Sequence, residues 1–235
     1  MLHLDHAALT ANNITYGAFG DAMGYWNFFP AEDGWGRIPV WGFADVVASR
    51  AEGISDGERV YGYFPMSSHL VVTAGRVTPG SFIDVAAHRA SLPPVYNLYQ
   101  RRKDRSPAHD EHFQAILRPL FTTSFLIDDW LAEERFFDAS SVVIASASSK
   151  TAFALAALLH ARGGVEVVGL TSARNADFVA GLGCYDRVVV YDDITSLDAS
   201  VPTVLVDMGG DASVLTSVHT HFAGSLRHSC QVGAT

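Results

Sequence analysis

The sequence predicts an α/β protein in which a β-rich N-terminal domain precedes a parallel sheet with helices on both faces. Two observations support this class. Up to about Pro119, short apolar segments alternate with turn-forming pairs such as Asp56-Gly57 and Ala74-Gly75, a pattern typical of antiparallel strands. From Ser141 onward, strand-length apolar runs alternate with helix-length segments. This alternation indicates a doubly wound parallel sheet.

The individual elements follow in chain order. In the N-terminal half, the apolar segments 46–48, 59–64 and 69–73 are predicted strands, and the polar range 84–118 is expected as an insertion with some helix. A helix is predicted over 121–137, with Asp128 and Asp129 on its solvated side. The C-terminal half should contain strands at 141–146, 165–171, 187–191, 203–208 and 226–233, and helices at 151–162, 174–182 and 211–222. We therefore expect two domains, 1–120 and 121–235.

Composition narrows the possible partners and location. The 235-residue chain has a formal net charge of −9, which argues against nucleic acid and anionic membrane surfaces as partners. No apolar run approaches the ~20 residues of a membrane span, and the first residues lack the pattern of a signal peptide. The two cysteines, Cys184 and Cys230, suggest reduced thiols and a cytoplasmic location. No cysteine or histidine set has zinc-ligand spacing, so we expect no metal.

The turn after the strand at 141–146 is the first candidate site. In a βαβ unit this turn meets a pyrophosphate, because the helix N-terminus and its dipole point there. Dinucleotide-binding turns usually carry the fingerprint G-x-G-x-x-G. The corresponding six residues here contain no glycine and include three serines and one lysine. The candidate cofactor-binding residues are Ser146, Ala147, Ser148, Ser149, Lys150 and Thr151.

Two other interpretations of this turn stay open. In one, Lys150 is simply solvated and a serine caps the helix, which needs no ligand. In the other, Lys150-Thr151 belongs to a P-loop, with Asp207 as the magnesium-binding residue. The two glycine positions of that motif are Ile144 and Ser149 here, so the loop could not wrap a phosphate with its backbone.

The end of the second strand suggests which cofactor the unit selects. An acidic residue at this place favours a free ribose 2′-hydroxyl, whereas hydroxyls with an arginine favour a 2′-phosphate. The residues here are Thr171, Ser172, Arg174 and Asn175. The pattern therefore predicts NADP(H) rather than NAD(H).

Longer stretches carry a resemblance to a known family. The phrases ALTANNITYGAFGDAMGYWNFFP, GWGRIPVWGFADVVAS, ERVYGYFPMSSHLVV, LRPLFTTSFLIDDW and SASSKTAFALAALL are similar to the DUF2855 family. More distantly, the chain resembles zinc-independent medium-chain dehydrogenase/reductases of the quinone and enoyl reductase type. The resemblance implies a GroES-like β-domain followed by a Rossmann domain. It also implies truncation at both ends, because Met1 would fall inside an early strand and Thr235 after the fifth Rossmann strand.

The resemblance also implies roles for single residues. Asn12 and Asn13 lie where those reductases carry a short motif under the nicotinamide, and Tyr25 lies near their proton-donor tyrosine. Gly42-Phe43-Ala44 replaces the Gly-His-Glu of zinc alcohol dehydrogenases. A helix start beside the nicotinamide would carry Thr122 and Ser124, and a strand end beside the ribose would carry Asp207, Met208 and Gly209.

Without a metal, a hydride from NADPH must be matched by a proton from a hydroxyl or water. Tyr25 is the first candidate donor and Tyr16 the second, with Tyr63 and Tyr96 behind them, although aromatic residues in such a cluster are more often packing residues. The aromatic content favours an apolar or conjugated substrate, namely an activated C=C bond or a quinone. The alternative is a non-catalytic nucleotide-binding or partner protein with the same fold. An open sheet edge after the fifth strand would favour a homo-oligomer.

Overall fold

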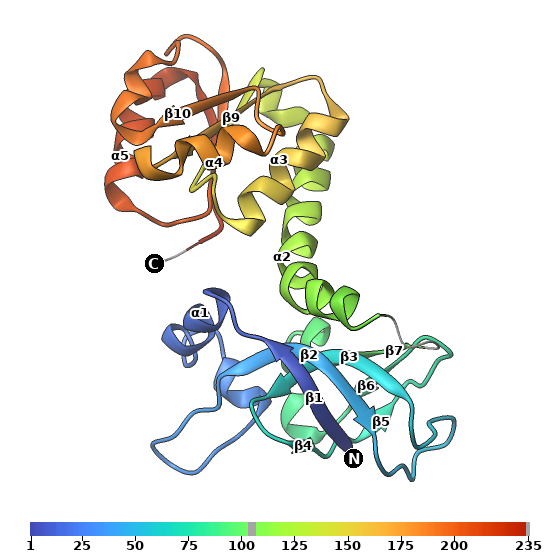
Figure 1. Cartoon of the computed structure of the whole chain (residues 1–235). Helices are drawn as coiled ribbons and strands as arrows, with labels where there is room; N and C mark the ends of the chain where they lie inside the picture. The colour runs from blue at the N-terminus through green and yellow to red at the C-terminus, as the bar shows by residue number, and fades with distance from the viewer. Residues whose placement is uncertain (103–106, 234–235) are drawn as a thin grey trace. The chain divides into compact units, whose positions relative to one another are not determined.

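The computed structural model describes residues 1–102 and 107–233 and divides into two compact units, Met1–Pro119 and Leu120–Thr235 (Figure 1). The first unit is built on an antiparallel sheet and the second on a parallel sheet with helices. The predicted fold class is confirmed.

The first unit contains a curled seven-stranded sheet in the order β4-β1-β2-β3-β7-β6-β5, in which every neighbouring pair is antiparallel (Figure 1). Its strands are β1 (Leu2–Ala8), β2 (Pro39–Val46), β3 (Arg59–Pro65), β4 (His69–Leu70), β5 (Ala74–Gly75), β6 (Ser81–Asp84) and β7 (Leu98–Arg102). Short helices connect them: α1 (Asn12–Ala18), η1 (Tyr25–Phe28), η2 (Ala87–Arg89) and η3 (Pro94–Asn97).

The range 84–118, expected as an insertion, contributes to this sheet. Its strand β7 pairs with both β3 and β6. Residues 103–106 of the range lie outside the described residues. The polar character that suggested an excursion has a local cause, because the side chains of Arg101 and Arg102 are only half-buried although their backbone is paired.

The strands of the first unit alternate between two apolar environments. Val40, Ala44 and Val60 pack with Phe64 in an aliphatic core, whereas Trp41 on the other face joins an aromatic cluster. This alternation is the two-residue period of a strand whose faces are both covered. The aromatic cluster is described below, because it includes the predicted tyrosines.

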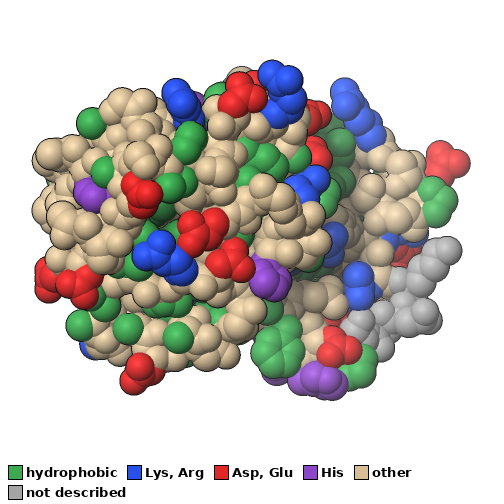
Figure 2. Space-filling view, turned by 90° about the horizontal axis from the view of Figure 1, so that it is seen from above, with side chains coloured by type: hydrophobic (Ala, Val, Ile, Leu, Met, Phe, Trp, Pro, Cys, Tyr) green, Lys and Arg blue, Asp and Glu red, His purple; other side chains and the backbone are tan. Residues whose placement is uncertain are grey.

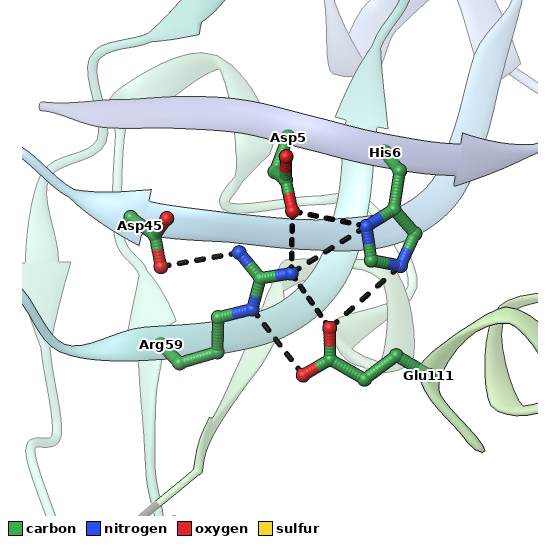
Figure 3. A network of polar contacts seen from close by, with 5 residues as sticks. All are labelled: Asp5, His6, Asp45, Arg59 and Glu111. Atoms are coloured by element: carbon green, nitrogen blue, oxygen red, sulfur yellow. Dashed lines mark hydrogen bonds and ion pairs between the residues drawn. The ribbon is translucent and has the colours of Figure 1, made fainter. Parts of the chain in front are cut away.

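A buried arginine fixes the first turns of the helix α2 (Ala108–Glu133) to this sheet (Figure 3). The Nε and Nη2 atoms of Arg59 donate to both oxygens of Glu111 at 3.3 and 2.6 Å, and further contacts join Arg59 to Asp5 at 2.7 Å and Asp45 at 3.1 Å. His6 lies 3.1 Å from Asp5 and 3.8 Å from Glu111. Burial opposes the charge of Arg59, but the carboxylates outweigh it and raise the pKa of the guanidinium.

The helix predicted at 121–137 has different bounds in the structure. It begins at Ala108, passes through Pro119 and ends at Glu133. Proline was expected to mark a boundary because it disrupts the interior of a helix. The prediction of its C-terminal end was wrong because Arg135, Phe136, Phe137 and Asp138 all have positive φ, between 49° and 57°. This left-handed turn stops the helix and places Phe137 against His228, with ring centroids 4.3 Å apart.

The second unit is a five-stranded parallel sheet in the order β10-β9-β8-β11-β12. Its strands are β8 (Ser141–Ala145), β9 (Glu166–Thr171), β10 (Arg187–Val190), β11 (Thr203–Asp207) and β12 (Leu226–Gln231). Its helices, apart from the end of α2, are α3 (Lys150–Arg162), α4 (Ala176–Gly181) and α5 (Ala212–Phe222). Each predicted strand and helix from 141 onward is present, with ends that differ by at most two residues from those predicted.

Helices cover both faces of the parallel sheet. One face packs Val142 and Ile144 against Leu131 of α2 and Leu155 of α3. The opposite face packs Val143 and Leu205 among residues of α5 and the segment after β10. Since β8 pairs with β9 on one side and β11 on the other, the chain reverses direction of winding at β8. Ligands of such sheets bind at this switch point, outside the carboxyl ends of the strands.

Asp128 differs from its predicted solvated position. Its side chain is 6% exposed and pairs with Arg162 of α3, whose Nε and Nη2 atoms donate to the carboxylate at 3.0 and 2.6 Å. Only Asp129 is exposed. The solvated position predicted for both residues therefore holds for Asp129 and is wrong for Asp128, which joins α2 to α3.

Surface charges are mixed in sign. On the face shown in Figure 2, acidic and basic side chains are interspersed.

Within residues 1–102 and 107–233, the helices lack the combination of length and hydrophobicity that a membrane span requires.

Candidate functional site

The turn after β8 begins with a left-handed serine and leads into the N-terminus of α3. Ser146, the first residue after the strand, has a φ of 57°, in the left-handed region where glycine is favoured. Its hydroxyl faces the end of β11, where a Cβ on Gly209 would collide with Ser146 Oγ. The hydroxyl also lies 3.5 Å from that of Tyr191, which follows β10. Ser146 therefore lies at the switch point between β8 and β11.

Three hydrogen bonds hold this turn in place. The N–H of Ala147 donates to Leu170 O at 2.9 Å, and the hydroxyl of Tyr185 donates to Ala147 O at 2.9 Å. The amide of Asn175 donates to Ser148 Oγ at 3.1 Å, which joins the end of β9 to the turn. Two predicted groups, 146–151 and 171–175, are thus brought together at one edge of the sheet.

Ser149 is the N-cap of α3. Its hydroxyl accepts the N–H of Ala152 at 3.3 Å, as the simple capping interpretation predicted. Lys150 and Thr151 open the helix, with Lys150 exposed. The positive charge of a lysine in a first helical turn is repelled by the positive end of the helix dipole. An anion bound at this place would offset that repulsion and stabilise the lysine.

Two buried hydroxyls at the end of β9 have no partner. Thr171 Oγ1 and Ser172 Oγ are shielded from solvent and have no hydrogen-bond partner within the described part of the chain. Buried polar groups are nearly always satisfied, so each such group requires an explanation. Arg174 is exposed two residues further on, and the segment 171–175 contains no acidic side chain. A phosphate group would satisfy these hydroxyls, and the residues therefore fit a 2′-phosphorylated dinucleotide.

The side chain of Asp207 lies at the end of β11 and bonds to the backbone of the turn that follows. Its carboxylate accepts the N–H groups of Gly209 at 3.1 Å and Gly210 at 2.9 Å, and the side chain is buried. Asp207 thus shapes the turn that follows β11. Met208, half-buried beside it, packs against the core on the α2 and α3 face.

The predicted tyrosines of the first unit form one aromatic cluster. The ring centroid of Tyr16 lies 4.8 Å from that of Tyr25 and 5.5 Å from that of Tyr63, and Tyr63 lies 4.7 Å from Tyr96. Trp41 of β2 stands 5.0 Å from Tyr63. The four tyrosines were predicted as candidates from the sequence, and their rings are packed together in the fold.

The hydroxyl of Tyr16 is distinguished by its hydrogen bonds. Its oxygen accepts the amide of Asn12 at 2.8 Å and the indole N–H of Trp41 at 3.0 Å. Burial raises the pKa of Tyr16 to about 12, and the hydrogen bonds from Trp41 and Asn12 oppose this rise. Although Tyr16 is only 4% exposed, both of its hydrogen-bond donors are partly exposed, so the hydroxyl lies just below the surface.

The other tyrosines have different environments. Tyr63 is fully buried, and its hydroxyl has no hydrogen-bond partner among the described residues. Burial, the largest cause, and a hydrogen bond with Tyr25 raise the pKa of Tyr96. A hydrogen bond that raises the pKa of Tyr96 is one that Tyr96 donates, so the oxygen of Tyr25 accepts it.

Of three further candidates, two have structural contacts and the third is exposed. Asn13 donates to Pro39 O at 2.8 Å and accepts the N–H of Thr10 at 2.7 Å, which anchors α1 to β2. Ser124 is buried in the middle of α2, with its hydroxyl 2.8 Å from Thr151 O. Thr122 is exposed on the same helix. Neither Thr122 nor Ser124 lies at a helix start, because α2 begins much earlier.

Three residues that contact the candidate groups were not predicted from the sequence: Trp41, Tyr185 and Tyr191. The contact of Trp41 with Tyr16 spans 25 positions, and that of Tyr185 with Ala147 spans 38. Tyr191 could have been found, because it follows a predicted strand at the same edge of the sheet as Ser146. Trp41 and Tyr185 carry no local pattern of this kind.

The family follows from a match over nearly the whole chain. The family model described as "Protein of unknown function (DUF2855)" matches residues 7–235. The chain belongs to the DUF2855 family. No curated protein matches the sequence significantly.

Solved structures establish the fold of this DUF2855 member. The alcohol dehydrogenase from Aeropyrum pernix superposes with a TM-score of 0.62 at 16% identity, over 100% of this chain and 71% of that one. The quinone oxidoreductase from Coxiella burnetii superposes with a TM-score of 0.54 at 16% identity, over 100% of this chain and 74% of that one. Escherichia coli K-12 YhdH with bound NADPH superposes with a TM-score of 0.51 at 16% identity, over 100% of this chain and 67% of that one. The likeness confirms the medium-chain dehydrogenase/reductase fold, with a GroES-like and a Rossmann part.

Among residues 1–102 and 107–233, no three His, Cys, Asp or Glu side chains are grouped as a metal site. The two cysteines are both free, and burial raises the pKa of each thiol.

Proposed function

We propose that this protein is an NADPH-dependent oxidoreductase that reduces an activated C=C bond or a quinone without a metal. The single observation that carries the proposal is the end of β9, where the buried hydroxyls of Thr171 and Ser172 lack partners among the described residues and lie beside exposed Arg174. Hydroxyls and an arginine without an acid are the chemistry that recognises a 2′-phosphate. The same fold in YhdH with bound NADPH supports this choice.

Two groups of residues would hold the cofactor in the second unit. The turn 146–149 and the first turn of α3 would bind the pyrophosphate, with Lys150 adding a positive charge. Thr171, Ser172 and Arg174 would bind the 2′-phosphate. Bound NADPH would supply a hydride, so the protein must supply or conduct a proton.

The hydrogen bonds of Tyr16 favour it as the proton donor. A phenol oxygen that accepts two N–H groups keeps its own O–H for donation outward. After proton loss, the same two N–H groups stabilise the phenolate. Tyr25, ranked first from the sequence, accepts a hydrogen bond from Tyr96 and has no such pair of N–H donors among the described residues. In this proposal Tyr16 is the donor, and Asn12 and Trp41 are positioning residues.

Side chains near Tyr16 in the chain favour an apolar substrate. Ile14, on α1, is 72% exposed, and Leu9 is 74% exposed. Large exposed apolar side chains on both sides of Asn12 in the chain fit a substrate with little polarity better than a sugar or a phosphate ester.

Matched tyrosine substitutions test this proposal. NADPH oxidation is followed with a quinone or an enone as acceptor, for the native chain and for Tyr16→Phe, Tyr25→Phe and Tyr63→Phe. We expect Tyr16→Phe to lower kcat for the enone by roughly 10²–10⁴-fold with unchanged NADPH affinity. The other two substitutions remove a hydroxyl from the same cluster and should change kcat little. A large loss in Tyr25→Phe with none in Tyr16→Phe would restore the ranking made from the sequence.

Trp41→Phe separates the positioning role from the donor role. It keeps an aromatic ring but removes the N–H that Tyr16 accepts. We expect a smaller loss of kcat than in Tyr16→Phe, and a rise in the tyrosine pKa seen in near-ultraviolet absorbance. NADPH binding without turnover of any quinone or enone would instead favour a nucleotide-binding protein without catalysis.

A further inference from the structure

The first unit contains an open cavity that the proposed reaction does not use. Its volume is about 320 Å³, within the range of small-molecule sites, which begins near ~300 Å³. The wall combines Phe28 and Phe29, at the end of η1, with Leu70 of β4 and Arg89 of η2. Exposed Arg37 and His88 line the same cavity.

The charge of this wall is opposite to that of the whole protein. The chain carries a net charge of −9, yet the cavity is lined by Arg37, Arg89, His69 and His88. Asp84 is its single acidic residue. That carboxylate is buried and already accepts the N–H groups of two backbone amides, at 3.0 and 3.1 Å, and lies 3.3 Å from Arg89 Nε. The negative charge of Asp84 and the positive charge of Arg89 cancel. The charge of Arg37 is then in excess, so the wall is net positive.

The base of the cavity is rigid and partly apolar. Arg89 is 1% exposed, with its guanidinium 4.6 Å above the ring of Phe29 and 5.8 Å from that of Phe28. It also donates to Asn97 Oδ1 at 3.4 Å. A side chain held in this way loses little conformational freedom when a ligand binds.

The rim retains hydrogen-bond donors. Arg37 donates to Pro30 O, and a guanidinium has five N–H groups, so donors are left for a ligand. Leu70 and the largely exposed Val71 provide apolar surface beside these donors.

We propose that this cavity binds a small organic carboxylate with an apolar body. The carboxylate would lie against Arg37 and His88 at the rim, and the body against Phe29 and Leu70. The inference goes beyond the proposed reductase function and does not depend on it. It concerns a second ligand, held by the first unit alone.

Calorimetric titration without any nicotinamide cofactor tests the site. The probe is 2-naphthoate, and its uncharged analogue 2-naphthalenemethanol is the matched ligand control. We expect 2-naphthoate to bind at least about tenfold more tightly than the alcohol, and added salt to weaken it, because the contact is between charges.

Variants of exposed residues locate the binding. Arg37→Gln and His88→Gln should each weaken 2-naphthoate, Arg37→Gln by about tenfold or more. Arg50→Gln is the control, since Arg50 is exposed but does not line the cavity. Three results would each overturn the proposal. They are equal affinities for the acid and the alcohol, an equal loss of affinity in Arg50→Gln and Arg37→Gln, and no detectable heat of binding. Since NADPH is absent, these outcomes are independent of the proposed reductase activity.

Discussion

Ser146 and Gly209 meet across the carboxyl edge of the parallel sheet, where the hydroxyl of Ser146 occupies the space that a Cβ on Gly209 would need. Ser146 has a φ of 57°, although only glycine adopts this conformation without cost. A serine at the place of a fingerprint glycine is therefore matched by a glycine on the neighbouring strand end. Gly209 therefore leaves room for the side chain that Ser146 places at this edge.

Gly209→Ala should destabilise the protein. The added Cβ collides with Ser146 Oγ, and overpacking of this kind costs roughly 1–3 kcal/mol. Ser146→Gly removes the colliding atom and the left-handed strain. In the double variant, we expect most of the loss caused by Gly209→Ala to be recovered. Urea unfolding of the four proteins measures the coupling, and strictly additive effects would show that the two residues do not interact.

Glu111→Gln should be among the most damaging single substitutions of the first unit. It removes the most buried of the three carboxylates around Arg59, whose side chain is 5% exposed, while Asp5 and Asp45 keep their contacts. Breaking a buried pair costs about 3–5 kcal/mol when the remaining charge has no other partner. We therefore expect a loss smaller than this value but larger than that of an exposed pair. Glu166→Gln is the control, because Glu166 and Arg187 are 37% and 44% exposed and 3.7 Å apart. An exposed pair contributes about 0–1 kcal/mol. Chemical unfolding compares the two, and similar losses would contradict the structural role of Arg59.

Stability should fall in alkaline solution. Burial raises the pKa of Tyr16 to about 12, and it also raises the pKa values of Tyr61, Tyr63 and Tyr99. Above about pH 10 the unfolded chain releases tyrosine protons that the folded chain retains. The free energy of unfolding then decreases by about 1.4 kcal/mol per pH unit for each such tyrosine. Urea unfolding at about pH 8 and about pH 11 checks this; unchanged stability would contradict the burial of these hydroxyls, and Tyr16→Phe should reduce the slope.

Treatment with EDTA should leave NADPH oxidation and thermal stability unchanged, because the proposed reaction uses no metal. Elemental analysis of the purified protein provides the second measurement. One equivalent of zinc that is lost together with activity would require a different mechanism.

The second unit was predictable from the sequence because its information is local. Buried parallel strands appear as short apolar runs, and each is followed by a turn of small or polar residues. The turn 146–149 and the strand end 171–175 could therefore be assigned to one edge. The hydrogen bond from Asn175 to Ser148 shows that they meet there.

The first unit was less predictable because its decisive contacts join distant positions. Arg59 and Glu111 are 52 residues apart, and Trp41 and Tyr16 are 25 apart. No spacing pattern links such pairs. The bounds of α2 were missed for a different reason, since Pro119 lies inside the helix and the left-handed residues after it include two phenylalanines.

Titration with NADPH and NADH, followed by fluorescence for the native chain and for Arg174→Ala, tests the central claim most directly. The account predicts that the native chain prefers NADPH. It also predicts that Arg174→Ala weakens NADPH by more than about tenfold and leaves NADH almost unchanged, since a charge-assisted contact contributes roughly 1.5–3 kcal/mol. Arg187→Ala, at another exposed arginine, should alter neither affinity. Equal affinity for both cofactors in the native chain, or equal losses in Arg174→Ala, would contradict the proposal that the end of β9 binds a 2′-phosphate.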